Sequence, residues 1–386
     1  MSKRKIIIVG TAYPYRGGLA VFNERLAREY MIQGYDVEMY TFTLQYPKFL
    51  FPGKSQYSSE SSPNDIIIHR KINSINPFNW LKVGREIKKI NADIMITKFW
   101  LPFMAPCFGT IERIVKKNKK TKVVSILDNV IPHEKRIGDK IFARYFINST
   151  QGFIAMSQSV MDDLGLFDKG KPRLLCLHPL YDNFGEKLNR EEALKKLNLD
   201  PNFQYILFFG IIRAYKGLDL LIEAYNKFRD SNNNVKLIIA GEFYENEEKY
   251  RLLIKHYHLE NEIILKDEFI PDSEVNLYFS ACDIVAQPYK NATQSGITQI
   301  AYHFEKPMLV TNVGGLSEIV PDKKVGYVVN VDTDEIVAAL QDFFENNRQQ
   351  DFEKNILIEK EKYSWKNMVD AIDDVVETLR ATSLQE

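Results

Sequence analysis

Arg213 and Lys216 are the residues whose types and spacing point most directly to chemistry. They stand three positions apart in a turn bounded by Gly210 and Gly217, directly after an apolar run. A guanidinium and an ammonium at this spacing can converge on one diphosphate and stabilise its negative charge. We therefore predict that both residues bind an anion. A solvated basic turn without a function is the alternative interpretation.

A second turn, at residues 288–298, places small hydroxylated residues and a glycine at the start of a predicted helix: Thr293, Ser295 and Gly296. The first turn of a helix presents unpaired N–H groups and the positive end of the helix dipole. These groups are suited to binding a phosphate. The sequence therefore predicts a second anion-binding element here.

Two glycine pairs mark further turns. Gly314 and Gly315 precede Glu318, whose carboxylate could accept hydrogen bonds from ribose or sugar hydroxyls. An acid that interacts only with a helix dipole is the alternative for Glu318. Gly17 and Gly18 precede a predicted helix, where close approach to the backbone would suit an anion or a sugar hydroxyl. A plain flexible turn is the alternative for this pair.

His133 lies in a polar loop, at residues 128–134, that follows an apolar run. An imidazole can donate a hydrogen bond to a phosphate or a sugar hydroxyl near neutral pH, so we predict a functional role for it. The other histidines are assigned structural positions, and no pair of them has zinc-like spacing with a nearby carboxylate: His69, His178, His256, His258 and His303. The sequence therefore predicts no metal site.

The elements that must position these residues follow a βαβ pattern, in which short apolar runs alternate with longer amphipathic stretches. Strands are predicted at residues 5–10, 37–42, 66–69, 93–99, 122–127, 152–156 and 173–178, and then at 206–210, 236–241, 263–266, 284–287, 308–311 and 326–329. We predict two α/β domains with Rossmann-like parallel sheets, at 1–185 and 186–362, and a closing helix at 363–386 that packs back toward the first domain. Ligands of such sheets bind beyond the carboxyl ends of the strands, so the turns would meet in a cleft between facing domains.

The composition excludes several classes of protein. The 386 residues carry 51 Lys and Arg against 51 Asp and Glu, and this net charge of 0 argues against nucleic-acid binding. Three cysteines without a CxxC pair argue against a disulfide framework or a zinc knuckle. No apolar stretch reaches the roughly 18 residues of a membrane span, and the amino terminus fits a strand better than an export signal. We expect a cytoplasmic protein.

Taken together and in this order, these segments resemble those of the retaining glycosyltransferases of family 4, which have the GT-B fold of two facing Rossmann-like domains. The resemblance covers nearly the whole chain and rests on three segments: residues 210–224, 293–296 and 314–318. It implies transfer of a sugar from a nucleotide-sugar donor to a glycan or lipid-linked glycan acceptor, in the synthesis of surface polysaccharide or glycoconjugates. It also implies that the enzyme needs no metal or other cofactor.

The resemblance assigns roles to the residues named above. Arg213 and Lys216 would hold the donor diphosphate and His133 would contact the donor. Gly17 and Gly18 would face the donor and acceptor, and the backbone around Ser295, Gly296 and Ile297 would hold a phosphate or the donor sugar. In such enzymes the leaving diphosphate is thought to help deprotonate the acceptor, so that the protein performs little covalent chemistry.

The chain departs from the family pattern at one place. Many members carry two glutamates eight positions apart, which here fall near Thr293 and near Gln299 or Ile300, and neither position is acidic. A subgroup of the family also lacks the pair, and glutamine can hydrogen-bond a hydroxyl without charge. The roles of Thr293, Gln294 and Gln299 therefore stay open.

Other interpretations concern function and location. A catalytically silent sugar-nucleotide-binding protein would explain the missing glutamates, and a nucleotide-sugar epimerase with the same fold would need paired carboxylates that the sequence does not offer. The loop at 46–54 and the basic run at 116–120 could contact a membrane peripherally, at its inner face. A packed loop and a solvated helix end explain these two segments equally well.

Overall fold

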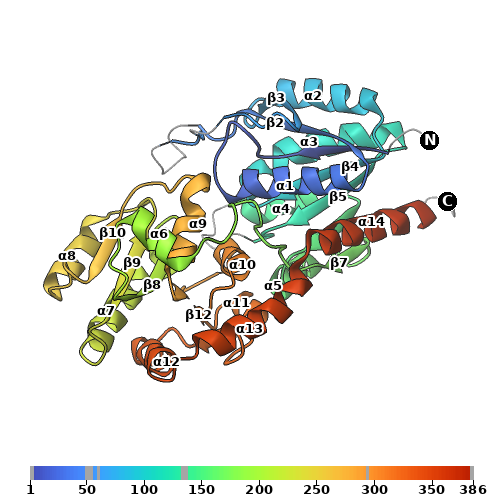
Figure 1. The fold of residues 1–386 in the computed structure, drawn as a ribbon. Helices are drawn as coiled ribbons and strands as arrows, with labels where there is room; N and C mark the ends of the chain where they lie inside the picture. Colours follow the sequence, from blue (N-terminus) through green and yellow to red (C-terminus); the bar gives the residue numbers. More distant parts are fainter. Residues whose placement is uncertain (1–3, 48–54, 59–60, 132–137, 293–294, 383–386) are drawn as a thin grey trace. The chain divides into compact units, whose positions relative to one another are not determined.

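The structure is a computed structural model that describes residues 4–47, 55–58, 61–131, 138–292 and 295–382. The chain divides into two units. Unit 1 consists of Met1–Pro179 together with Ser364–Glu386, and unit 2 consists of Leu180–Tyr363. Figure 1 shows the two units and the path of the chain through them.

Unit 1 is built on a seven-stranded parallel sheet with the order β3-β2-β1-β4-β5-β6-β7. The strands are β1 (Lys5–Val9), β2 (Asp36–Leu44), β3 (Ile67–Asn73), β4 (Ile94–Phe99), β5 (Lys122–Leu127), β6 (Gly152–Ala155) and β7 (Arg173–Leu175). Alternate residues face opposite sides of the sheet, and both sides are covered by helices. The strands β4 and β5 are therefore buried along their whole length and are mostly apolar, as in other parallel sheets.

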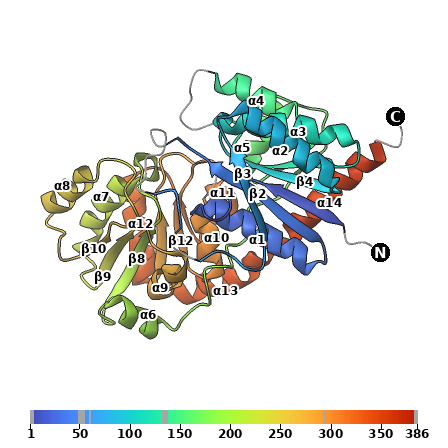
Figure 2. The ribbon, with the colours of Figure 1, turned by 90° about the horizontal axis from the view of Figure 1, so that it is seen from above.

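Helices α2 (Pro77–Ile90), α3 (Ala105–Val115), α4 (Asp139–Ile147) and α5 (Gln158–Gly165) share one apolar core with the sheet. Within it, α2 packs against α3 and α3 packs against α4. Helix α14 (Trp365–Thr382) packs against β5, β6 and β7 and against α1 (Gly18–Ile32). Figure 2 shows α2, α3 and α4 together on one side of the sheet and α14 on the other. The last helix of the chain is thus part of unit 1.

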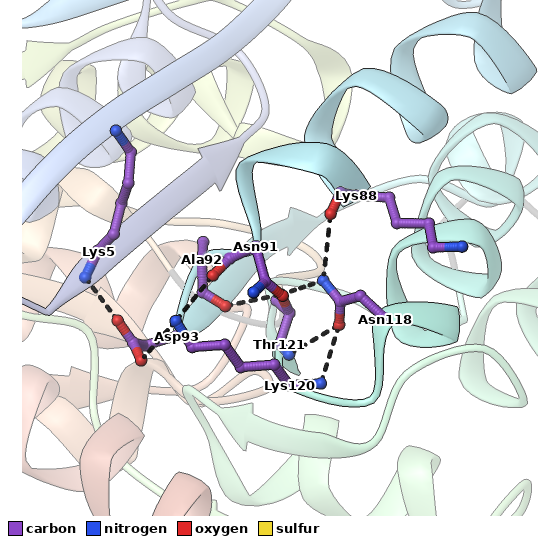
Figure 3. A network of polar contacts seen from close by, with 8 residues as sticks. All are labelled: Lys5, Lys88, Asn91, Ala92, Asp93, Asn118, Lys120 and Thr121. Atoms are coloured by element: carbon purple, nitrogen blue, oxygen red, sulfur yellow. Dashed lines mark hydrogen bonds and ion pairs between the residues drawn. The ribbon is translucent and has the colours of Figure 1, made fainter.

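A polar network closes the amino ends of β4 and β5 (Figure 3). The Oδ1 of Asn118 accepts hydrogen bonds from the amides of Lys120 and Thr121, at 3.0 and 2.9 Å. The hydroxyl of Thr121 donates to the carbonyl of Ala92 at 2.7 Å. Part of the basic run at 116–120 therefore has a structural role in the loop that leads into β5.

Unit 2 is built on a six-stranded parallel sheet with the order β10-β9-β8-β11-β12-β13. Its strands are β8 (Gln204–Phe209), β9 (Val235–Ala240), β10 (Ile263–Lys266), β11 (Ile284–Gln287), β12 (Met308–Thr311) and β13 (Gly326–Val329). Its helices are α6 (Arg190–Leu197), α7 (Leu218–Arg229), α8 (Glu248–His256), α9 (Val275–Ala281), α10 (Gly296–His303), α11 (Leu316–Ile319), α12 (Thr333–Glu345) and α13 (Gln349–Glu359). The prediction of an α/β fold with two Rossmann-like parallel sheets is confirmed.

Local sequence explains where several of these helices begin. The Asn76 side chain accepts hydrogen bonds from the amides of Phe78 and Asn79, and Pro77 occupies the first position of α2. Asp332 caps α12 in the same way.

The three cysteines have free thiols. Within the described residues, no helix combines the length and the apolar character needed to cross a membrane.

Candidate functional site

The turn that carries Arg213 and Lys216 follows β8 and leads into α7. It begins at Gly210 with φ 95° and ends at Gly217 with φ 68°, backbone conformations that favour glycine. A Cβ added at Gly217 would collide with the carbonyl oxygen of Pro288. Both glycines are therefore required by the shape of the turn, which places the two cations beyond the carboxyl end of β8.

Lys216 is half-buried, and its ammonium lies 5.5 Å from the ring centroid of Tyr289. The guanidinium of Arg213 lies 5.6 Å from the ring centroid of Tyr244. Among the described residues, neither cation is paired with a carboxylate. Burial, and next the positive charge of Arg213, lower the pKa of Lys216 to about 8. Two cations without a counter-ion therefore share a partly desolvated place, which an anion would stabilise.

The turn that leads into α10 follows β11, the strand next to β8. Ser295 caps the helix by accepting a hydrogen bond from the amide of Ile297 at 3.2 Å, and its hydroxyl lies 3.2 Å from that of Tyr289. A Cβ at Gly296 would lie 2.7 Å from the ring of Tyr181, so this glycine permits a close contact. The predicted residues Thr293 and Gln294 lie outside the described part of the chain.

Several contacts hold the two turns together. The amide of Lys290 donates a 2.6 Å hydrogen bond to the carbonyl of Tyr215. The side chain of Ile297 approaches Gly210, where it would lie 3.2 Å from an added Cβ. The ammonium of Lys216 lies 3.5 Å from the same position. The structure thus brings Lys216 and the first turn of α10 to the same glycine.

The remaining predicted residue of unit 2 is Glu318. It is exposed on the short helix α11, which follows β12. The end of β12 is tied to the α10 turn because the hydroxyl of Thr311 donates to the carbonyl of Tyr289. Glu318 therefore lies just after β12, and β12 is the neighbour of β11, the strand that leads into the α10 turn. Both interpretations of its carboxylate stay open.

Gly17 and Gly18 are the predicted site residues of unit 1 that lie within the described part of the chain. Gly17 caps α1 with φ 96°, and Gly18 is the first residue of that helix. A Cβ at Gly17 would meet no atom within 4 Å, so the backbone conformation alone favours glycine there. His133 lies outside the described residues.

One buried ionic cluster in unit 1 escaped the sequence interpretation. The ammonium of Lys98, at the end of β4, lies 3.1 Å from the carboxylate of Asp128 and 3.1 Å from the ring centroid of Phe22. Burial lowers the pKa of Lys98 to about 8 although Asp128 opposes the shift. Burial and the charge of Lys98 also lower the pKa of His178 to about 3, so its imidazole is neutral at physiological pH. Only the position of Lys98 at a strand end could have signalled this cluster.

Two buried glutamines in unit 2 are also notable. Gln287 ends β11 and Gln299 lies in α10, and their side-chain oxygen and nitrogen atoms have no hydrogen-bond partner among the described residues. Gln299 stands near the position where the family pattern places its second glutamate. A buried amide without a hydrogen-bond partner lowers the stability of the folded protein, unless a bound molecule supplies that partner.

Comparisons with known proteins agree with this architecture. Residues 189–359 match the family model for glycosyl transferases group 1. An uncharacterized glycosyltransferase of Methanocaldococcus jannaschii is 24% identical over 82% of this chain and 82% of its own length. The lipopolysaccharide 1,2-N-acetylglucosaminetransferase of Salmonella typhimurium is 25% identical over 49% of this chain and 52% of its own.

Solved structures show the same fold over nearly the whole chain. Sucrose-phosphate synthase of Thermosynechococcus elongatus has a TM-score of 0.76 at 14% identity and covers 98% of this chain and 100% of its own. HepE of Anabaena, in complex with UDP and glucose, has a TM-score of 0.73 at 17% identity and the same coverage. Residues 189–359 therefore form a group 1 glycosyl transferase domain, and the chain as a whole has the GT-B fold of glycosyltransferases.

Proposed function

We propose that this chain is a retaining glycosyltransferase of family 4 that transfers a sugar from a nucleotide-sugar donor to a glycan or lipid-linked glycan. The observation that carries the proposal is the pair Arg213 and Lys216, which no described carboxylate neutralises. Two relatives support it: HepE was solved with UDP and glucose, and the Salmonella typhimurium relative acts on lipopolysaccharide. The proposed setting is the synthesis of surface polysaccharide or glycoconjugates.

In the proposed reaction, the bond between the anomeric carbon and the donor phosphate oxygen breaks while the acceptor oxygen attacks from the same face. The acceptor proton passes to the leaving diphosphate, which keeps the electron pair of the broken bond. Arg213 and Lys216 stabilise the charge that develops on that diphosphate. Each charge-assisted contact contributes about 1.5–3 kcal/mol. No metal is needed for this charge stabilisation.

A nucleotide-release assay with a panel of sugar nucleotides and lipid-linked oligosaccharide acceptors tests the proposal. We expect release of one nucleoside diphosphate that an acceptor stimulates and that EDTA does not change. Arg213→Ala and Lys216→Ala should each lower kcat/KM by about tenfold to a hundredfold and leave the thermal midpoint intact. Lys255→Ala, an exposed lysine on α8, is the matched control and should behave as wild type. Wild-type kinetics in both the Arg213 and the Lys216 variant would contradict the proposal.

A silent sugar-nucleotide-binding protein is the second candidate, favoured by the absence of acidic residues at the positions of the family glutamates. It predicts that the donor binds tightly and is never turned over. Binding without release of a nucleoside diphosphate, with every acceptor in the panel, would support this candidate over the enzyme.

A further inference from the structure

Several segments of unit 1 meet beyond the carboxyl ends of its strands. Gln45 follows β2, Trp100 follows β4, and the turn that ends at Gly17 follows β1, the strand between them. Gln56 joins them, because its carbonyl accepts a 3.1 Å hydrogen bond from the amide of Arg16 in that turn. Ligands of parallel α/β sheets bind beyond this edge. The segments therefore lie where a ligand of unit 1 is expected.

Tyr46 holds these segments together. Its carbonyl accepts a 3.1 Å hydrogen bond from Nε2 of Gln56, and its hydroxyl accepts a 2.6 Å hydrogen bond from Nε1 of Trp100. The ring of Tyr46 stacks on that of Phe103, with 6.0 Å between the ring centroids and 29° between the ring planes. These four side chains are half-buried, so part of each reaches the surface. Together with Gln45 we call them the Tyr46 cluster.

Two amide oxygens of the Tyr46 cluster lack a hydrogen-bond donor. The Oε1 atoms of Gln45 and Gln56 are buried and accept no hydrogen bond within the described part of the chain. The bond from Nε2 of Gln56 to Tyr46 fixes the orientation of that amide, because only its nitrogen can donate to a carbonyl. Gln45 is only 6% exposed, and its main-chain amide donates to the hydroxyl of Tyr15. A ligand that brings O–H or N–H donors would supply what these two oxygens lack.

The chemistry of the Tyr46 cluster selects a class of ligand. An amide oxygen only accepts hydrogen bonds, so it suits a hydroxyl group and is repelled by the oxygens of a phosphate or a carboxylate. Indole and phenol rings present apolar faces on which C–H groups can pack. A pyranose ring carries hydroxyl donors at its edge and C–H groups on its face, so it matches both features. A hydrocarbon chain would leave the two amide oxygens without donors.

We propose that the Tyr46 cluster binds an uncharged pyranose ring of the acceptor glycan. The ring packs against the aromatic side chains of Tyr46 and Trp100, and its hydroxyls donate to Oε1 of Gln45 and Gln56. This inference rests on the proposed function, which assigns the donor diphosphate to the two cations of unit 2 and requires a second substrate. It adds the residues that hold this second substrate and the chemical class of the sugar.

Saturation-transfer NMR with methyl glycosides tests this proposal in the absence of any donor. The neutral probes are the methyl pyranosides of glucose, galactose and mannose at millimolar concentration, and the corresponding methyl uronides are their charged counterparts. Wild type should transfer saturation to the ring C–H protons of at least one neutral probe. It should bind the uronide of the same sugar more weakly, because the carboxylate would meet amide oxygens.

Variants of the Tyr46 cluster locate the bound sugar. Trp100→Leu and Gln56→Leu should each weaken binding of the neutral probe by about threefold to tenfold. Trp100→Phe keeps an aromatic face and should retain most of the binding, which separates a lost ring contact from a lost fold. Gln158→Leu, an exposed glutamine on α5, is the matched control and should bind as wild type does. Unchanged circular dichroism verifies that each variant is folded.

The glycoside experiment is independent of the proposed activity. Arg213→Ala, which should lower nucleotide release, should leave saturation transfer to the neutral probe unchanged. A chain that binds the glycoside and releases no nucleotide would therefore contradict the proposed function and leave the sugar site standing.

Three outcomes would overturn the proposal. Absence of saturation transfer to all three neutral probes would exclude the sugar site. A uronide that binds as tightly as its neutral counterpart would show that the site does not select an uncharged ring. Wild-type affinity in both Trp100→Leu and Gln56→Leu would place the bound sugar elsewhere and would show that trapped water satisfies the amide oxygens.

Discussion

The backbone amide of Lys290 donates a 2.6 Å hydrogen bond to the carbonyl of Tyr215, and this bond joins the turns that follow β8 and β11. The side chain of Lys290 reinforces the joint, because its ammonium lies 2.7 Å from the carboxylate of Asp219 on α7. Lys216, the residue after Tyr215, is therefore positioned by main-chain contacts. A cation held in this way needs little reorganisation when a ligand charge develops.

The pH dependence of ligand binding should report Lys216, whose pKa lies at about 8 without ligand. Its protonated form attracts a diphosphate, so affinity for the nucleoside diphosphate of the proposed reaction should change little near pH 7 and should fall by up to tenfold per unit above pH 8. Titration calorimetry with UDP at pH values from about 6.5 to 9.5 measures how this affinity depends on pH. Lys216→Arg keeps its charge over the same range and should flatten the curve; an unchanged fall in this variant would assign the titration to another group.

Gly217→Ala should destabilise unit 2 strongly. The new Cβ would collide with the carbonyl oxygen of Pro288 and would hold alanine at a φ of 68°. We expect a loss of about 3 kcal/mol or more in the free energy of unfolding, measured with denaturant. Gly170→Ala is the control, because a Cβ there meets no atom within 4 Å, and it should change stability by less than about 0.5 kcal/mol. Equal changes of the unfolding free energy in the Gly217 and Gly170 variants would contradict the close contact between Gly217 and Pro288.

Acid should destabilise unit 1 partly through His178. Its pKa is lowered from 6.5 to about 3 in the folded state, so the unfolded chain binds more protons between these values. This contribution to the stability is complete above about pH 6.5 and is lost as the pH falls toward 3. The Nδ1 of His178 lies 2.7 Å from the carbonyl of Pro179, and His178→Asn can keep that hydrogen bond without titrating. Its unfolding free energy should fall less between pH 6.5 and 4 than that of wild type; parallel curves would contradict the assignment.

Replacing the buried glutamines by leucine should not destabilise the free protein. Gln287→Leu and Gln299→Leu each remove a buried amide that has no partner among the described residues, and should leave stability unchanged or raise it by about 1 kcal/mol. Thr97→Val is the contrast, because it removes a 2.8 Å hydrogen bond to the buried Glu112 and should cost about 1–3 kcal/mol. A comparable loss in the glutamine variants would show that bound water satisfies their amides.

Much of the fold could be predicted because its strands are apolar runs with clear ends. The predicted bounds of β5, β10, β11, β12 and β13 coincide with those of the structure. The turn from Gly210 to Gly217 could be predicted for a related reason, since its glycines allow a backbone that other residues resist. In both cases the controlling interactions are local in sequence.

The features that could not be predicted depend on contacts between residues that lie far apart in the sequence. Lys98 lies inside an apolar strand sequence, and only the fold shows that Asp128 and Phe22 surround its ammonium. The sequence interpretation divides the domains at residue 185, within a polar stretch that runs from residue 181 to residue 203. The structure divides the units after Pro179, because Leu180 hydrogen-bonds to Tyr363 and so belongs with unit 2.

The position of α14 has a consequence for the order in which the protein is made. Unit 1 takes this helix from Ser364–Glu386, after all of Leu180–Tyr363 has been translated. At about 5–20 residues per second, the ribosome needs roughly ten to forty seconds to make the intervening unit 2. During that time the surfaces of β5, β6 and β7 that α14 covers in the folded protein stay uncovered. Unit 2 is continuous in sequence and can complete its own sheet first, so the nascent chain finishes its second half before its first.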